Sequence, residues 1–443
     1  MEMTRTQHLA FVQTFGCQMN VHDSETIRGV LAEMGYGMAA SEEEADLILL
    51  NTCSVREKPH RKVFGKLGEL RKLKDARPGL LIGVCGCMAQ LVPEQLKQAA
   101  PHVDLIVGTR NYAELAETIR RAHANHHCEE VLDLERAIPE GTPALRQSRV
   151  VAWVTVIYGC NNFCAYCVVP YARGRERSRR PADVLDEILG LAAGGCREVT
   201  LLGQNVNTYG ADLDDGVDFA GLLARMDTVP GIERIRFTTS HPKDCSERLI
   251  EAVASLPKVC EHLQLPVQSG DDDVLRRMNR TYTAAQYVEL VERARAAIPG
   301  LALTTDVMVG FPGETEAQFA HTMELFRRIE FDQAFMFKYN NRPMVASAAM
   351  PDQVPEVVKQ QRLEQLVALQ NAISRRRNRA FEGHSVEVLV EGPRAGRPGQ
   401  LQGRTRGNRL VVFEGSTDLV GQLVPVRVLE GRVWGLMGDV ANR

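Results

Sequence analysis

YGCNNFCAYCVVPYARGRERSRR, residues 158–180, carries Cys160, Cys164 and Cys167 in a Cys-x3-Cys-x2-Cys pattern. It directly follows VVAWVTVI, residues 150–157, an apolar and β-branched run that predicts a buried strand. The cysteines are therefore expected on a loop at the carboxyl end of a strand, where α/β folds place their chemistry. Three thiolates can hold three irons of a four-iron cluster, which leaves the fourth iron open to a ligand. The competing interpretations are three structural thiols or a zinc knot, although zinc prefers four ligands and paired Cys-x2-Cys.

This spacing resembles the signature of the radical S-adenosylmethionine enzymes. In that superfamily the amino and carboxylate groups of S-adenosylmethionine chelate the open iron, and an electron cleaves its sulfonium to give a 5′-deoxyadenosyl radical. The resemblance implies that Cys160, Cys164 and Cys167 hold a 4Fe-4S cluster.

Length and composition bound the remaining possibilities. The 443 residues suffice for about three domains with hydrophobic cores. With a net charge of −3, any polyanionic partner must be met by local basic patches. The eleven cysteines are an odd number, unlike a disulfide framework, and neither a signal peptide nor a membrane-spanning run is recognisable. The sequence predicts a protein of the reducing cytoplasm with no membrane partner.

The N-terminal third alternates short apolar runs with helical patterns. This rhythm predicts four βα units and hence a parallel sheet covered by helices, in a domain of residues 1–145. The expected strands are 9–15, 46–51, 80–84 and 104–107, and the expected helices are 23–34, 55–73, 93–99 and 112–122.

Cysteines follow the first three of these strands, in the sequences FGCQMN, NTCSV and GCMAQ. Because parallel strands end at one edge of a sheet, Cys17, Cys53 and Cys87 can converge there and hold a second cluster. The alternative is three ordinary buried cysteines. Cys85 competes with Cys87 for the third place, but it lies closer to the strand, where its side chain is more apt to point inward. The adjacent Asn20 and Asn51 are interpreted as hydrogen-bond donors to sulfur or as turn residues.

Residues 146–378 continue the alternation with six further strands, which predicts a partial (β/α)6 barrel, open on one side. The strands are expected at 150–157, 198–202, 234–239, 260–266, 302–309 and 333–339, with helices including 181–193, 284–297 and 316–329. Loops on the rim that bears the cysteines are expected to bind S-adenosylmethionine. The candidate contacts are Gly203, Gln204, Asn205, Ser240, Gln268, Gly270 and Gly310, although each glycine taken singly is more often a turn residue.

Two basic regions suggest nucleic acid. Five arginines between residues 173 and 180 are interpreted either as a solvated basic face or as phosphate contacts. After a long polar helix over residues 355–379, five short β-type runs in 379–443 predict a small all-β barrel of the oligonucleotide-binding kind. From Arg375 onward, twelve arginines and no lysine face seven acidic residues, a local charge of +5 that favours RNA or DNA over a protein partner.

Taken together, the two cysteine triads and the small barrel resemble the methylthiotransferases, over nearly the whole chain. That family combines an N-terminal cluster domain, a radical S-adenosylmethionine core and a C-terminal TRAM domain. The motifs that carry the resemblance are TFGCQMN, NTCSVREKPHRKVFGKLG, GCMAQ and GCNNFCAYCVVPYARGRERSR. They are closest to the branch that acts on N6-(dimethylallyl)adenosine in tRNA.

The resemblance implies a methylthio insertion at C2 of that adenosine at position 37, adjacent to the anticodon. It implies two 4Fe-4S clusters, the auxiliary one at Cys17, Cys53 and Cys87. It further implies two S-adenosylmethionine per turnover, one as methyl donor and one as radical source, a reductant such as flavodoxin, and a monomer. The alternatives are the same chemistry on threonylcarbamoyl-adenosine or a ribosomal protein, or an iron–sulfur sensor without turnover. One departure is YNNRPMVASA, residues 339–348, where the family pattern has a glycine after the proline.

Overall fold

A computed structural model describes residues 7–54, 57–125, 128–138, 140–342 and 344–441. The chain forms two units. The first unit comprises residues 1–147, 157–161 and 167–179, and the second comprises 148–156, 162–166 and 180–443. The ranges 1–145, 146–378 and 379–443 stay predictions for the domains.

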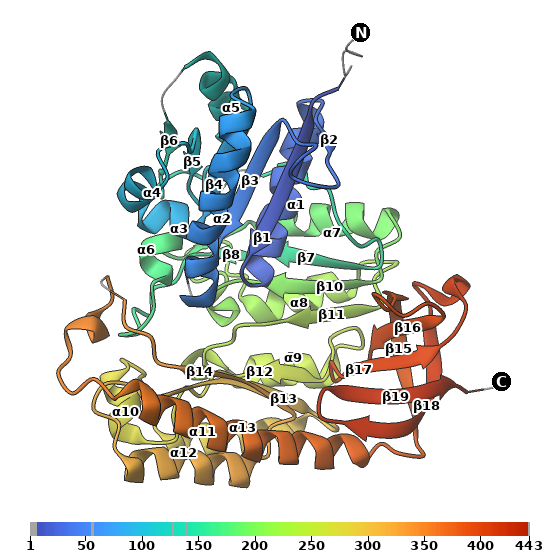
Figure 1. Ribbon diagram of the computed structural model, residues 1–443. Coiled ribbons are helices and arrows are strands. Elements are labelled where there is room, and N and C mark those ends of the chain that lie inside the picture. The colour runs from blue at the N-terminus through green and yellow to red at the C-terminus, as the bar shows by residue number, and fades with distance from the viewer. Residues whose placement is uncertain (1–6, 55–56, 126–127, 139, 343, 442–443) are drawn as a thin grey trace. The chain divides into compact units, whose positions relative to one another are not determined.

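A six-stranded parallel sheet forms the centre of the first unit (Figure 1). Its order is β2-β1-β3-β4-β5-β6, with β1 (Leu9–Phe15), β2 (Gly37–Met38), β3 (Leu47–Thr52), β4 (Leu81–Gly86), β5 (Leu105–Val107) and β6 (Glu129–Val131). The four predicted strands are confirmed. The two-residue β2 and the three-residue β6 escaped prediction because they are short and lie at the edges.

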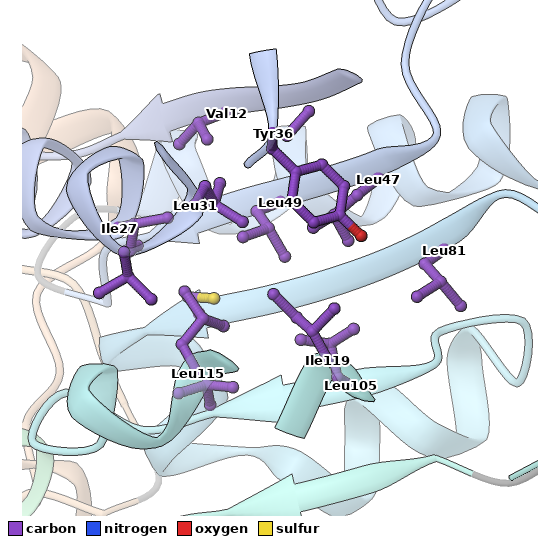
Figure 2. Close-up of a cluster of buried hydrophobic side chains, with 14 of the residues drawn as sticks. Val12, Ile27, Leu31, Tyr36, Leu47, Leu49, Leu81, Leu105, Leu115 and Ile119 are labelled. Atoms are coloured by element: carbon purple, nitrogen blue, oxygen red, sulfur yellow. The ribbon is translucent and has the colours of Figure 1, made fainter. Parts of the chain in front are cut away.

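The central strands are apolar throughout because helices cover both faces of the sheet. Every residue of β3 and β4 is buried, as in parallel sheets generally. Leu47 and Leu49 point to one core and Ile48 and Leu50 to the other. Figure 2 shows the first of these cores, in which Leu49 lies among side chains of α1 (Gln18–Glu33) and α5 (Leu115–Ala124).

The first unit also contains the helices α2 (Glu57–Ala76), α3 (Cys87–Leu91) and α4 (Pro93–Ala99). Residues 55–56 of the predicted helix 55–73 lie outside the described residues. In the sheet, β1 lies between β2 and β3. The chain passes from β1 to β2 on one side and then crosses to β3 on the other side. The carboxyl ends of β1 and β3 therefore form a topological switch point, the usual place for a site in such a sheet.

The second unit contains the predicted partial barrel. Strands β7 (Val151–Thr155), β10 (Glu198–Leu202) and β11 (Arg234–Phe237) pair in parallel, as do β12 (His262–Gln264), β13 (Ala302–Val309) and β14 (Gln333–Lys338). A parallel bridge between Ile235 and Val259 joins the two sheets. All six strands thus follow one another in chain order, which confirms the half-open barrel.

Helices α7 (Pro181–Ala193), α11 (Ala284–Ala297) and α12 (Glu316–Ile329) lie at their predicted positions. The last two begin sharply because Thr283 and Thr315 cap them reciprocally with a glutamine three residues on. Three shorter helices, α8 (Phe219–Asp227), α9 (Glu247–Ser255) and α10 (Asp272–Arg277), complete the cover. None of the described helices has the length and apolar character needed to cross a membrane.

The long helix α13 (Glu356–Arg379) leads into a closed five-stranded barrel, drawn in red in Figure 1. Its order is β15-β16-β17-β19-β18, with β15 (Ser385–Pro393), β16 (Gln400–Arg404), β17 (Leu410–Glu414), β18 (Leu423–Arg432) and β19 (Gly435–Val440). Side chains alternate between the interior and the surface along β18, as a closed sheet requires. The predicted small all-β barrel is confirmed.

Arginines attach this barrel to the amino ends of the parallel strands, opposite the loops expected to bind a ligand. Arg236, within β11, pairs with buried Glu198 at 2.7 Å and donates to the carbonyls of Thr405 and Arg406 at 2.6 and 2.5 Å. Arg406 in turn pairs with Glu261, and Arg409 pairs with Asp332. Part of the C-terminal arginine surplus therefore holds the fold together.

Candidate functional site

Three cysteines meet at the switch point of the first sheet. Cys17 follows β1 and is the N-cap of α1, Cys53 follows β3, and Cys87 opens α3 directly after β4. The Cys17 and Cys53 thiols are hydrogen-bonded, and this contact lowers the pKa of Cys17 to about 6, with help from nearby Arg173. A Cβ at Gly16 would lie 2.7 Å from the Cys53 Cβ, so a side chain there would crowd the second cysteine. The structure thus brings together the residues proposed for the auxiliary cluster.

The choice between Cys87 and Cys85 follows from their surroundings. Cys85 is fully buried in the hydrophobic core within β4, and burial raises its pKa to about 12. Cys87 is also buried, which raises its pKa, but Arg173 acts against this by hydrogen bonding and by charge. Of these two cysteines, Cys87 is the one with Arg173 beside it, a cation that favours a thiolate.

The side-chain amides of Asn20 and Asn51 donate hydrogen bonds between the start of α1 and the end of β3 rather than to sulfur. The Asn20 amide nitrogen donates to Asn51 Oδ1 at 3.2 Å and to the Thr52 carbonyl at 3.1 Å, while its Oδ1 accepts from the Cys17 thiol at 3.4 Å. The Asn51 amide donates to the Asn20 carbonyl and to Ser24 Oγ. The expectation that these amides donate to sulfur is wrong, because their N–H groups hold the start of α1 against the end of β3.

A buried ion pair lies behind the three cysteines. Arg173, on α6 (Val169–Arg173), contacts Asp23 of α1 with 2.6 Å between Nη2 and Oδ2, and both side chains are at most 5% exposed. The Tyr112 hydroxyl donates to the same carboxylate oxygen at 3.5 Å. The Nη1 of Arg173 is buried without a hydrogen-bond partner among the described residues. Sequence reasoning missed Asp23, whose only signal is a charge on the buried face of a helix.

The donor set fits an anionic iron–sulfur cluster. Cubane thiolates each take a different iron, and a nearby cation with an unused N–H compensates the charge that they bring. No three His, Cys, Asp or Glu side chains within the described residues stand close enough to share a single ion.

The Cys160 motif is held by its own loop. The Cys160 N–H donates to the Gly174 carbonyl at 3.1 Å. Gly159 has φ +73°, and a Cβ there would meet the Arg175 carbonyl oxygen at 2.0 Å, so only glycine fits. Cys160 is buried and Cys167, just before α6, is half-buried. All eleven cysteines are described, and no disulfide joins any of them.

Cys164 is held by the segment after α10. The Ala165 N–H donates to the Met278 carbonyl at 2.9 Å, and the Asn279 amide donates to the Phe163 carbonyl at 3.0 Å. Arg280 Nη1 reaches the Cys164 sulfur at 3.5 Å. Nothing in the sequence motif pointed to residues 278–280 as the support of this cysteine.

The residues predicted to bind S-adenosylmethionine differ in what their polar atoms already contact. Ser240 Oγ and Gln204 Oε1 are buried without partners among the described residues, which suits a bound polar ligand. The Asn205 side chain already has two protein partners, since it donates to Asp244 at 2.7 Å and accepts from the His241 N–H at 3.1 Å. Gly203 is buried where β10 ends, and Gln268 has φ +66° with its N–H bound to the Asp306 carbonyl.

Two of the predicted glycines have packing roles. A Cβ at Gly270 would lie 2.6 Å from the Thr322 Cα of α12, and one at Gly310 would lie 2.4 Å from Lys359 Cγ of α13. Because these two glycines have no side chain, α12 and α13 can pack closely against the loops that contain them.

The arginine run after the cysteines is largely ion-paired. Arg173 and Arg179 are buried, and Arg179 pairs with Glu140 at 2.6 Å. Arg177 pairs with Glu135 and Arg180 with Asp183, both at 2.6 Å. Arg173 and Arg179 are therefore not part of a solvated basic face, whereas Arg175 and Arg180 are exposed.

Hydrogen bonds hold the segment of residues 339–348, which lacks the glycine of the family pattern. Tyr339 is buried, and its hydroxyl donates to Ser347 Oγ at 2.9 Å. The Ser347 N–H donates to the Ala165 carbonyl, one residue from Cys164. Met344 stands at the glycine position and is 36% exposed, while Pro343 lies outside the described residues.

Comparison with known proteins places these features in a family. Residues 9–108 match the "Uncharacterized protein family UPF0004", residues 154–326 the "Radical SAM superfamily" and residues 379–441 the "TRAM domain". The chain is 52% identical to a tRNA-2-methylthio-N(6)-dimethylallyladenosine synthase of Carboxydothermus hydrogenoformans, over 97% of this chain and 98% of the relative. It is 51% identical to the protein of the same name from Desulforamulus reducens, over 98% and 95%.

Among solved structures, the chain is similar to the radical S-adenosylmethionine methyltransferase TsrM from Kitasatospora setae. The TM-score is 0.56 and the identity 14%, over 77% of this chain and 75% of the other. At this identity the likeness bears on the fold alone.

Proposed function

Because the chain belongs to the tRNA-2-methylthio-N(6)-dimethylallyladenosine synthase family of radical S-adenosylmethionine enzymes, we propose that it methylthiolates N6-(dimethylallyl)adenosine in tRNA. The reaction replaces the C2 hydrogen of the adenine at position 37, beside the anticodon. The protein acts in the cytoplasm, as a monomer, with a low-potential reductant such as flavodoxin.

The meeting of Cys17, Cys53 and Cys87 beside the buried Arg173 carries this proposal. A radical enzyme that only cleaves S-adenosylmethionine needs the Cys160, Cys164 and Cys167 cluster alone. The second triad gives a separate cluster at which sulfur for transfer is held. Six cysteines thus account for two 4Fe-4S clusters.

The chemistry of the substrate explains the need for these cofactors. An aromatic C–H bond offers neither an acidic proton nor a leaving group, so acid–base side chains cannot activate it. One cluster would supply the sulfur, and the other would generate the radical. Of the two S-adenosylmethionine molecules, one would supply the methyl group and the other the radical itself. The chain orients S-adenosylmethionine through groups such as Gln204 and Ser240, whose buried oxygens lack partners among the described residues.

The C-terminal barrel offers a surface suited to RNA. Trp434 is 41% exposed, and the guanidinium carbons of Arg394 and Arg432 lie 5.6 and 5.8 Å from the centre of its ring. An exposed aromatic ring between arginines suits base stacking and phosphate contact. The single-stranded anticodon loop lets the target adenine leave its stack at low cost.

Mass analysis of tRNA nucleosides tests the proposal. The anaerobically reconstituted protein is incubated with S-adenosylmethionine, a reductant and tRNA bearing either N6-(dimethylallyl)adenosine or threonylcarbamoyl-adenosine. A methylthio mass increase on the dimethylallyl nucleoside alone supports both reaction and substrate. An increase on the other nucleoside alone would refute the substrate, and no increase on either, with both clusters present, would refute the reaction on tRNA.

A further inference from the structure

Arg280 is a buried cation in the second unit that touches a candidate cluster ligand. Arg280 is 7% exposed, and each of its three guanidinium nitrogens makes a hydrogen bond. Nη2 donates to the Pro266 carbonyl at 2.7 Å and Nε contacts the Tyr282 hydroxyl at 3.0 Å. Nη1 donates to the Cys164 sulfur at 3.5 Å. Its position is therefore fixed by three directed contacts.

The charge of Arg280 has no carboxylate partner within the described part of the chain. The other buried arginines of the second unit each have one: Arg234 pairs with Glu387, Arg236 with Glu198 and Arg362 with Glu314. Burying an uncompensated charge costs several kcal/mol, and arginine stays protonated at any ordinary pH. An anion is therefore expected beside Arg280 in the working protein.

The groups around Arg280 leave one candidate for that anion. Tyr282 lies under the guanidinium at 5.2 Å, and its hydroxyl donates to backbone carbonyls, so it stays protonated. His241 packs edge-to-face on Tyr282, and its burial, together with the charge of Arg280, lowers its pKa to about 2, so it is neutral. Tyr166 and Cys164 are, after Tyr282, the acidic groups that act most strongly on Arg280. Of these, only a thiol becomes an anion at neutral pH, when it binds iron.

We propose that Arg280 is the counter-ion of an iron–sulfur cluster bound at Cys164, and that its N–H···S hydrogen bond to Cys164 raises the reduction potential of that cluster. The inference depends on the proposed role of Cys164 as an iron ligand. Reduction adds negative charge, which a fixed cation and a hydrogen bond to sulfur both stabilise. Arg280 is thus a positioning residue that makes electron uptake easier.

The test is a redox titration, followed by electron paramagnetic resonance, of full-length protein with only this cluster. A Cys17→Ala/Cys53→Ala/Cys87→Ala background removes the other triad. In this background Arg280→Met removes the charge and the hydrogen bonds of Nη1 and Nη2, whereas Arg280→Lys keeps the charge. Arg276→Met is the matched control, because Arg276 lies four residues earlier with its side chain 74% exposed and paired to Asp273.

At a fixed applied potential, the ratio of reduced to oxidised cluster should fall about tenfold in Arg280→Met, which is a midpoint about 59 mV more negative for one electron. Arg280→Lys should shift less, and Arg276→Met should not shift. Iron retained by Arg280→Lys but lost from Arg280→Met would also support the counter-ion role. Full iron with an unchanged midpoint in Arg280→Met, or iron lost equally from both Arg280 variants, would overturn it. Absence of this cluster from the background protein itself would instead refute the proposed function of the Cys160 motif.

Discussion

Replacing Asp23 by Asn removes the anion that compensates Arg173 behind the first cysteine triad. Both side chains are at most 5% exposed, and their atoms lie 2.6 Å apart. Removing one partner of such a pair leaves a buried unpaired charge and costs about 3 to 5 kcal/mol. In the apoprotein this loss should weaken the first unit, where α1 and α6 carry the pair.

Amide hydrogen exchange of peptides from β1, β3 and β4 measures the effect in the first unit itself. A loss of that size lowers protection by roughly 100- to 4,000-fold, since each tenfold change is about 1.4 kcal/mol. The double variant with Arg173→Met should recover most of the protection, because no unpaired charge remains. Glu117→Gln breaks an exposed pair with Arg120 in the same unit and should change protection little.

Reconstitution with iron and sulfide adds a second arm to this experiment. Cluster thiolates at Cys17 and Cys87 would supply a new anion beside Arg173, so the penalty of Asp23→Asn should shrink in the reconstituted protein. An equal loss of protection with and without the cluster would refute the idea that Arg173 compensates cluster charge. Protection unchanged in the apoprotein would refute the energetic importance of the pair.

Three further predictions concern stability and iron content. His241 and His262 have pKa values lowered to about 2 and about 3, with burial as the largest cause; the unfolded chain therefore binds more protons below about pH 6.5, and the stability of the second unit should fall by about 1.4 kcal/mol per histidine between pH 7.5 and 5.5. Urea unfolding of the apoprotein, followed by its two tryptophans, checks this, and a flat profile would contradict it. Arg236→Met should cost about 3 to 5 kcal/mol by leaving a buried carboxylate unpaired and should speed hydrogen exchange in the C-terminal barrel; unchanged exchange there would argue against this attachment. The Cys85→Ser variant should keep the iron of the auxiliary cluster but lose about 1 to 3 kcal/mol of stability through a buried hydroxyl. The Cys87→Ser variant should lose the auxiliary cluster. The reverse pattern of iron content would exchange the two assignments.

The regular elements were predictable because their signals are local. Continuous apolar runs marked the buried parallel strands, and helical patterns marked the two helices whose first turns the structure shows capped by Thr283 and Thr315. That Cys85 lies closer than Cys87 to the predicted strand was enough to predict which of the two lies beside the other cysteines.

The supports of the two sites were not predictable in this way. Asp23 and Arg173 are 150 positions apart, and Cys164 and Arg280 are 116 apart. Such contacts join single loop or helix positions and leave no periodic pattern in the sequence. The same limitation made the arginine run look like a free basic face, since the carboxylates of Glu135 and Glu140 reach it only in the folded chain.

The most direct measurement of the two-cluster claim compares wild-type protein with Cys17→Ala and Cys160→Ala in one anaerobic reaction on tRNA bearing N6-(dimethylallyl)adenosine. Both 5′-deoxyadenosine and the methylthio nucleoside are quantified. Cys160→Ala should form neither product, and Cys17→Ala should still release 5′-deoxyadenosine while forming no methylthio nucleoside. Full methylthio transfer by Cys17→Ala would contradict the assignment of the first triad to sulfur transfer.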